Sequence, residues 1–284
     1  MAGDGVTRAS DPPELRLDAA VTSALLIDFI RRETRKAGFR RAVLGLSGGV
    51  DSALAALLAA RALGPRNLHC VLLPYRSSSP GSLRDALRVA KLVGSRATRI
   101  GITPMIDAYF GRHGRVPRLR RGNKIARERM AVLYDLSARD RALVLGTSNK
   151  TELLLGYGTV HGDLASGLNP LGDLYKTQVR RLALHLGLPA DLAGRTPTAD
   201  LWKGQTDEAE IGYSYDVVDR LLVHLVDRRG SAQEAVTAGF PRGMVRRITR
   251  LVETTQYKRR TPIIAKVSQR TVGVDFLYPR DWGR

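Results

Sequence analysis

The chain has 284 residues and a hydrophobic fraction of 43%, which suits one α/β domain but not two large ones. No stretch approaches the about 20 uncharged apolar residues of a membrane span, and residues 1–13 lack the apolar core of a signal peptide, so we expect no membrane partner and a cytoplasmic location. The net charge of +19 favours anionic ligands without by itself indicating nucleic acid, and the lone cysteine, Cys70, excludes an intrachain disulfide and cysteine-based metal clusters.

Apolar runs alternate with helical patterns through the first half of the chain. After a flexible tail over residues 1–12, the spacing predicts an amphipathic helix over residues 13–37. Strands are predicted at residues 42–46, 68–73, 97–102 and 142–145, and helices at residues 51–63, 82–93 and 123–138. This alternation is typical of a doubly wound, mostly parallel, Rossmann-like sheet, in which ligands bind beyond the carboxyl ends of the strands.

The pattern changes after Pro170. Helical patterns then cover residues 175–186, 208–226, 231–238 and 242–253, and the stretch from residue 261 is irregular. We therefore expect one α/β domain over residues 13–284 that carries added C-terminal helices.

A glycine-rich turn, SGGVDS at residues 47–52, joins the first predicted strand to the next helix. Its glycines let backbone N–H groups approach phosphate oxygens, and the helix N-terminus adds partial positive charge. Ser47 and Ser52 can donate to the same oxygens, and Asp51 is expected to hold Mg²⁺ that bridges to the phosphates. No Walker-type Gly-Lys-Ser/Thr element is present. The turn resembles the pyrophosphate-binding loop of the N-type ATP pyrophosphatases; the alternative is a helix start capped by Asp51.

A second polar cluster, GTSNKTE at residues 146–152, also lies between a predicted strand and a helix. Glu152 offers a second carboxylate that can share the metal with Asp51, and Thr147 offers a hydroxyl for the nucleotide. The alternative is a capped helix start, with Ser148 or Asn149 as the N-cap.

Six segments, taken together and in order, resemble the NAD synthetase family. They are residues 122–130, 146–157, 169–177, 197–202, 204–208 and 258–260. The resemblance implies an adenine-nucleotide alpha-hydrolase-like fold. It also implies ATP-dependent amidation of nicotinate adenine dinucleotide (deamido-NAD) to NAD, through an adenylated carboxyl group and with release of AMP and pyrophosphate.

The resemblance also implies roles for individual residues. ATP would be bound by Gly45, Leu46, Ser47, Gly48, Gly49, Val50, Asp51, Ser52, Thr147, Lys176 and Thr198. Deamido-NAD would be contacted by Arg127, Asp163, Tyr257 and Lys258, and Mg²⁺ by Asp51 and Glu152. Lys176 and Mg²⁺ are suited to stabilise the charge that develops on the phosphates, and Asp173 is a candidate base. The alternatives are a solvated run at Lys258 and a helix-face lysine at Lys176.

Departures from the family pattern lie on the dinucleotide side. Val160 and His161 stand where many members have Lys-Tyr, Gly167 replaces an aspartate, and Tyr257 replaces a histidine. Our hypothesis is a variant pocket for the same substrate, in which His161 or Asp163 supplies polar contacts.

The nitrogen donor is predicted to be ammonia. Glutamine-dependent relatives carry an amidase domain ahead of the ligase, whereas about 40 residues precede the first predicted strand here. Cys70 lies within a predicted strand and is an unpromising nucleophile. Ammonia would be taken up directly or delivered by a separate glutaminase, and the resemblance further implies a homodimer.

Two other function classes stay open at this point. One is a tRNA-modifying ligase or thiolase with the same ATP loop, which the charge of +19 favours slightly and the lone cysteine disfavours. The other is a nucleotide-binding relative without turnover, which the presence of Asp51, Glu152 and Lys176 disfavours.

Overall fold

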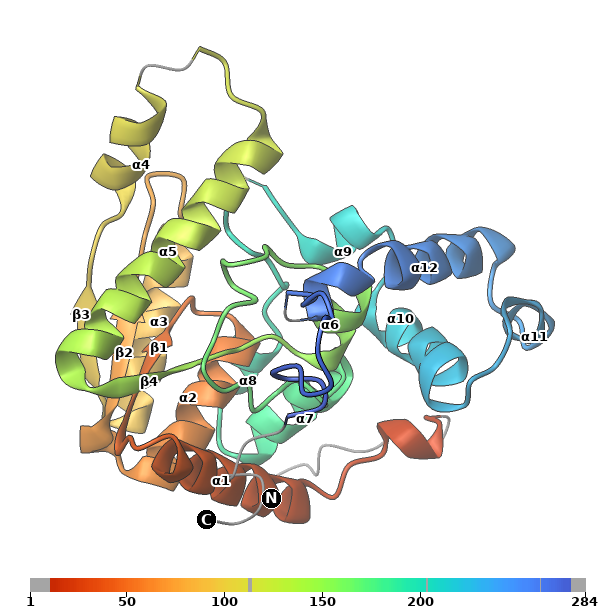
Figure 1. The fold of residues 1–284 in the computed structure, drawn as a ribbon, viewed down its shortest axis with the longest axis horizontal. Coiled ribbons are helices and arrows are strands. Elements are labelled where there is room, and N and C mark those ends of the chain that lie inside the picture. The colour runs from red at the N-terminus through yellow and green to blue at the C-terminus, as the bar shows by residue number, and fades with distance from the viewer. Residues whose placement is uncertain (1–10, 112–113, 203, 261, 277–284) are drawn as a thin grey trace.

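A sheet of four parallel strands forms the centre of the protein (Figure 1). The computed structural model describes residues 11–111, 114–202, 204–260 and 262–276. The strands are β1 (Arg41–Gly45), β2 (Leu68–Leu72), β3 (Arg96–Arg99) and β4 (Ala142–Leu145), in the order β3-β2-β1-β4. Every neighbouring pair is parallel. The carboxyl ends of the strands therefore meet at one edge of the sheet.

Successive residues of β1 face two different hydrophobic cores. Ala42 and Leu44 belong to one buried cluster and Val43 to another, as the period of two in a strand requires. The first face is covered by α1 (Ala19–Lys36), α2 (Val50–Leu63), α3 (Pro80–Val93) and α7 (Lys176–His185). The second face is covered by α4 (Thr103–Phe110) and α5 (Arg118–Asp140). Helices on both faces confirm the predicted doubly wound α/β fold.

The C-terminal helices form a layer of their own beside the sheet (Figure 1). They are α9 (Asp207–Ile211), α10 (Tyr215–Leu222), α11 (Ala232–Thr237) and α12 (Arg242–Thr254), with a π-helical turn at Val223–Asp227 and a 3₁₀ turn at Gln256–Arg259. Their buried cluster includes Leu155 at the end of α6 (Lys150–Leu155) and Tyr175 just before α7. A short helix, α8 (Ala190–Ala193), follows α7. The C-terminal layer thus packs against the two helices that begin at the carboxyl edge of the sheet.

Several observed elements differ from the predictions. The helix expected over residues 208–226 is divided, because Gly212 takes a φ of +89° that ends α9. The strand expected over residues 97–102 is the exposed edge strand β3 and ends at Arg99. Helix α4 was not predicted; it is short and starts at Thr103, between Gly101 and Gly111.

The N-terminal segment also differs from its prediction. A 3₁₀ turn at Pro13–Leu15 precedes α1, which begins at Ala19 because the Asp18 carboxylate caps its first turn. Asp11 falls within the predicted tail, yet its side chain is buried and ion-paired with Arg181 of α7. The packed structure therefore starts earlier than expected, and residues 1–10 lie outside the described residues.

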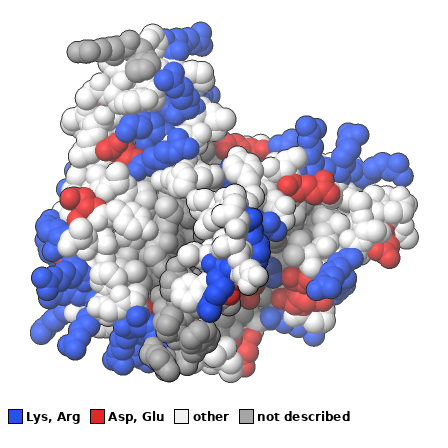
Figure 2. Space-filling model, viewed as in Figure 1, with Lys and Arg blue, Asp and Glu red and all other residues white. Residues whose placement is uncertain are grey.

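Charged side chains are distributed over the surface rather than gathered on one element. Figure 2 shows lysine and arginine along the edge of the sheet layer, over the projecting end of α5 and over the C-terminal helices, with acidic residues among them. None of the helices in the described ranges combines the length and apolar character needed to cross a membrane.

Candidate active site

A cavity of about 1040 Å³ lies at the carboxyl ends of the strands. It is bounded by the glycine-rich turn after β1, the end of β2, the turn after β4, one side of α5, and loops that precede α9 and follow α12. Most of the predicted site residues line it: Gly45, Leu46, Ser47, Gly49, Val50, Asp51, Ser52, Arg127, Thr147, Glu152, Asp163, Lys176, Thr198, Tyr257 and Lys258. The fold therefore brings together segments more than 200 residues apart in the sequence.

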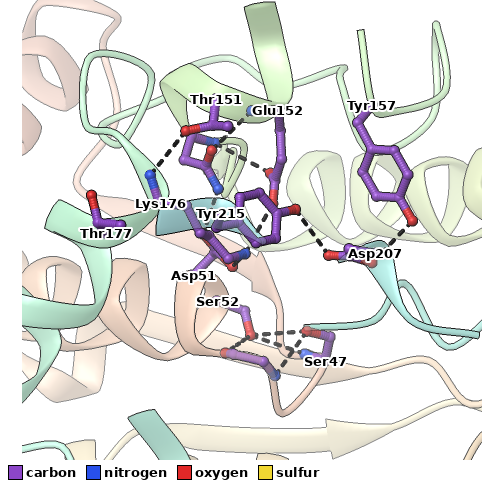
Figure 3. Close-up of polar contacts among 12 residues, drawn as sticks. Ser47, Asp51, Ser52, Thr151, Glu152, Tyr157, Lys176, Thr177, Asp207 and Tyr215 are labelled. Atoms are coloured by element: carbon purple, nitrogen blue, oxygen red, sulfur yellow. Dashed lines mark hydrogen bonds and ion pairs between the residues drawn. The ribbon is translucent and has the colours of Figure 1, made fainter. Parts of the chain in front are cut away.

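The glycine-rich turn is held in a compact conformation. Gly48 takes a φ of +85°, and a Cβ there would lie 2.4 Å from the carbonyl oxygen of Ser82. Glycine is therefore required at this position, both because of the positive φ and because there is no room for a side chain. The Ser52 hydroxyl donates to the Gly49 carbonyl (2.9 Å) and lies 3.1 Å from the Ser47 hydroxyl (Figure 3). The turn is thus fixed by its own side chains, with α2 beginning directly after it.

Lys176 is the central residue of the site. Its side chain is only 2% exposed, and its Nζ donates to Asp51 Oδ2 at 2.5 Å and to Glu152 Oε1 at 3.0 Å (Figure 3). Asp51 lies in the first turn of α2, Glu152 lies in the first turn of α6 and Lys176 begins α7. Three helix starts therefore converge on one buried ammonium group.

Asn149 connects the two carboxylates. Its side-chain amide donates to Asp51 Oδ1 at 2.8 Å, and its backbone N–H donates to Glu152 Oε2 at 3.4 Å. Its side-chain oxygen accepts from the Glu152 backbone N–H at 3.0 Å. Asn149 is thus the N-cap of α6, as one interpretation of the sequence held, and also a direct support of Asp51.

Burial and charge shift the acidities of this group. Burial raises the pKa of Glu152 to about 8, and the Asp51 charge adds to the shift while Lys176 opposes it. Burial disfavours the ammonium form of Lys176, but the two carboxylates outweigh this effect and raise its pKa. The two carboxylates therefore favour the charged form of Lys176 at this site.

The carboxylate pair suits Mg²⁺. Asp51 and Glu152 converge on one point, and Mg²⁺ usually takes one or two carboxylates together with phosphate oxygens and water. Among the described residues, no group of three or more His, Cys, Asp or Glu side chains is arranged to hold a metal. Phosphate and water oxygens would have to complete the coordination.

The NAD synthase family model matches residues 22–262. This chain belongs to the NAD synthase family. The NH₃-dependent NAD⁺ synthetase of Trichlorobacter lovleyi is 53% identical over 95% of this chain and 99% of its own length. Its counterpart in Chlorobaculum parvum is 51% identical over 96% and 98%, respectively. The ligase class expected from the sequence is confirmed by this membership.

Solved structures agree with the family. The NH₃-dependent NAD synthetase of Campylobacter jejuni superposes with a TM-score of 0.75 at 32% identity, over 88% of this chain and 100% of that one. A structure described as NMN synthetase from Francisella tularensis has a TM-score of 0.79 at 28% identity, over 88% and 99%. The glutamine-dependent enzyme of Acinetobacter baumannii matches 95% of this chain but 50% of its own, with a TM-score of 0.66 at 29% identity.

In the part of the cavity predicted to bind the dinucleotide, cationic side chains contact backbone carbonyls. Arg127 donates to the Val160 carbonyl at 3.1 Å, and Lys258 Nζ donates to the Gly156 and Gly158 carbonyls at 2.7 and 2.9 Å. These bonds fix the loop that follows α6 around the cavity.

The two residues proposed to supply polar contacts there have different positions. Asp163 lines the cavity and accepts from the Thr159 backbone N–H at 2.9 Å, and its side chain remains accessible to solvent. His161 is exposed, takes a φ of +61° and does not line the cavity. Of the two residues, Asp163 is therefore the better placed to supply a polar contact inside the cavity.

Asp173 is not placed at the cavity. Its side chain is 99% exposed and its carboxylate lies 3.5 Å from Lys150 Nζ, on the outer side of the α6 start. The geometry gives no support to Asp173 as a base, because the loop before α7 directs it away from Lys176.

Several site residues were not assigned from the sequence. Asp207 accepts from the hydroxyls of Tyr157 (3.0 Å) and Tyr215 (3.2 Å), and Tyr215 lies beneath Lys176, with Nζ 5.2 Å from the ring centre (Figure 3). Asp207 falls in the segment 204–208 that carried part of the resemblance, so a signal existed for it. Tyr215 contributes through a tertiary contact that no local pattern reveals.

Proposed function

We propose that this NAD synthase amidates the nicotinate carboxylate of deamido-NAD with ammonia, using ATP. A carboxylate oxygen attacks the α-phosphorus of ATP and pyrophosphate leaves. Ammonia then attacks the activated carboxyl carbon, and AMP leaves with the carboxylate oxygen. The observation that carries the proposal is the buried Lys176 between Asp51 and Glu152, beside a glycine-rich turn, in a member of this family.

The residues of the chain divide this work by position. We infer that the turn from Gly45 to Ser52 binds phosphate through its N–H groups at the start of α2. Lys176 is held where it stabilises negative charge that develops on the phosphoryl oxygens, and its fixed position limits the reorganisation needed in the reaction. Asp51 and Glu152 would hold Mg²⁺, which would supply further charge neutralisation for the phosphates.

The other assignments complete the proposal. Thr147 and Thr198 lie where they could contact ATP, and Arg127, Asp163, Tyr257 and Lys258 line the part of the cavity proposed for deamido-NAD. We further propose a homodimer, a cytoplasmic location, and ammonia taken up directly or from a separate glutaminase. The names of the relatives at 53% and 51% identity support ammonia as the donor.

The decisive test is product formation with defined substrates. Purified protein is mixed with ATP, Mg²⁺ and deamido-NAD, with either ammonium or glutamine. NAD is detected by its reduction with alcohol dehydrogenase, and AMP by chromatography. NAD with ammonium, matched by AMP and absent with glutamine, is the expected result.

A parallel reaction replaces deamido-NAD with nicotinate mononucleotide, because one structural neighbour is described as an NMN synthetase. AMP formed with the mononucleotide and not with the dinucleotide would overturn the substrate assignment. ATP binding without AMP from either substrate would overturn the enzymatic assignment.

A further inference from the structure

A buried carboxylate outside the cavity lies behind the catalytic centre. Asp219, in α10, has a relative exposure of 0%, and no ion pair with it occurs among the described residues. It is absent from the cavity lining. A carboxylate buried without a cation is costly unless hydrogen bonds compensate it.

The hydrogen bonds of Asp219 lead to both catalytic helix starts. Its Oδ1 accepts from the Thr151 hydroxyl at 2.6 Å, and its Oδ2 accepts from the Thr177 backbone N–H at 2.9 Å. The same Thr151 hydroxyl oxygen accepts from the Lys176 backbone N–H at 3.0 Å (Figure 3). Thr151 immediately precedes Glu152, and Thr177 immediately follows Lys176. One carboxylate therefore joins the first turn of α6 to the first turn of α7.

We propose that Asp219 is a positioning residue for the ligase reaction, which acts through Thr151 to fix the separation of Glu152 and Lys176. The inference rests on the proposed function, since it assigns Lys176 and Glu152 to the reacting centre. Asp219 does not touch the cavity. It fixes the backbone from which the reacting groups extend, and it does so from the C-terminal helical layer.

The physical reason for such a device is the demand on geometry at Lys176. Electrostatic stabilisation of a transition state depends on groups held in place beforehand, and a displacement of about 1 Å can reduce the rate about 100-fold. Lys176 and Glu152 are 24 residues apart in sequence and belong to different helices. Besides the link through Asp219, the two first turns are joined by the Lys176–Glu152 ion pair and by the Thr151 bond to the Lys176 N–H. Of these two contacts, only the Thr151 bond holds the backbone of Lys176.

A second carboxylate of the same layer offers a matched control. Asp227, in the π-helical turn, accepts from Lys150 Nζ at 2.8 Å and from the Tyr175 hydroxyl at 2.9 Å. It thus also joins the α6 start to the α7 start. Its contacts are with the ends of side chains, however, and not with the backbone of Lys176 or Thr177. It should stabilise the layer without setting the position of Lys176.

The experiment compares Thr151→Val, Thr151→Ser and Asp227→Asn with the wild-type protein, each assayed well below its own Tm. Thr151→Val removes the hydroxyl at nearly constant volume, and we expect its kcat to fall about tenfold or more while the KM for ATP changes less than about threefold. Thr151→Ser keeps the hydroxyl and is expected to retain about half of kcat or more. Asp227→Asn is expected to lower Tm but keep kcat within about twofold.

Asp219→Asn is added in combination with Thr151→Val. Because both residues act through one chain of hydrogen bonds, the double variant is expected to be no slower than the slower of the two single variants. Should Asp219→Asn fail to fold, the two Thr151 variants still test the inference, since they separate the hydroxyl from side-chain volume.

Several results would overturn the inference. Thr151→Val with a wild-type kcat and a lowered Tm would make the contact structural, and so would Thr151→Ser as slow as Thr151→Val. Asp227→Asn slowed as much as Thr151→Val would mean that any loosening of the layer slows the enzyme. If wild-type protein forms no NAD, the proposed function fails first, and this inference fails with it.

Discussion

The part of the cavity proposed for ATP (the ATP side) and the part proposed for deamido-NAD (the dinucleotide side) are held together by different kinds of contact. In the part proposed for ATP, charged side chains contact one another: Lys176 lies between Asp51 and Glu152, and Asn149 donates hydrogen bonds to both carboxylates. On the dinucleotide side, Arg127 and Lys258 each bind carbonyl oxygens of the loop after α6. The contacts on the ATP side fix the positions of the reacting groups. The contacts on the dinucleotide side fix the loop that lines the cavity. Substitutions should therefore affect kcat and stability on one side, and KM on the other.

Lys176→Met should have the largest effect. Removing the ammonium deletes the charge that faces the phosphates and leaves two carboxylates buried side by side. We expect kcat to fall at least about 100-fold, and the free energy of unfolding to fall by about 3–5 kcal/mol. NAD formation and thermal unfolding measure the two effects.

Lys150→Met is the matched control for this change. Lys150 also begins a helix and also contacts carboxylates, but it lies outside the cavity lining. Its kcat is expected to stay within about twofold of wild type. A Lys176→Met enzyme with a kcat close to that of Lys150→Met would contradict the role given to Lys176.

Gly48→Ala tests the turn on the ATP side, with Gly38→Ala as its partner. The two glycines have nearly the same φ, +85° and +83°, but a Cβ at Gly38 meets nothing within 4 Å. Both variants carry the strain of a positive φ, about 1–2 kcal/mol. Gly48→Ala must in addition displace the backbone of Ser82, so we expect a further loss of stability and a loss of ATP affinity of about tenfold or more. Calorimetric titration with ATP checks this, and equal affinities for the two variants would contradict it.

Lys258→Met tests the other side of the comparison. The change releases the Gly156 and Gly158 carbonyls, so the loop after α6 should lose its fixed position at the cavity. We expect the KM for deamido-NAD to rise about fivefold while the KM for ATP and kcat stay within about twofold. Lys266→Met, in the C-terminal segment and outside the cavity lining, is the control. A fall in kcat with both KM values unchanged would show that the two sides are not separate in this sense.

Asp163→Asn and His161→Ala should have the smallest effects, and they separate two residues of one loop. Asp163 lines the cavity and His161 does not. We expect the KM for deamido-NAD to rise about threefold with Asp163→Asn and to stay unchanged with His161→Ala. A raised KM for deamido-NAD with His161→Ala, and an unchanged KM with Asp163→Asn, would instead identify His161 as the residue that supplies the polar contact.

The sequence predicted the sheet well because its strands are apolar runs bounded by glycine and charge. The predicted ends of β1, β2 and β4 lie within about one residue of the observed ends. Edge strand β3 was predicted too long, since half-exposed residues give a weaker pattern. The break at Gly212 was missed because one glycine within an amphipathic pattern does not reveal whether its φ is positive.

The site was predictable where a motif is contiguous and unpredictable where it is assembled by packing. The turn at residues 47–52 and the cluster at residues 146–152 can each be recognised from consecutive residues. The ring of Tyr215 beneath Lys176 and the amide of Asn149 on Asp51 depend on contacts between distant helices. Asp173 was named as a candidate base, and its outward direction depends on the conformation of the loop before α7, which the sequence pattern does not reveal.

The ammonium of Lys176 also acts as an internal counter-ion. Asp51, Glu152 and Lys176 together hold one net negative charge when both carboxylates are ionised, so the acidic centre does not depend on an external cation to assemble. A newly made chain could therefore reach its native state whatever the supply of magnesium around it. Chelating agents would be expected to stop turnover and leave the melting temperature almost unchanged.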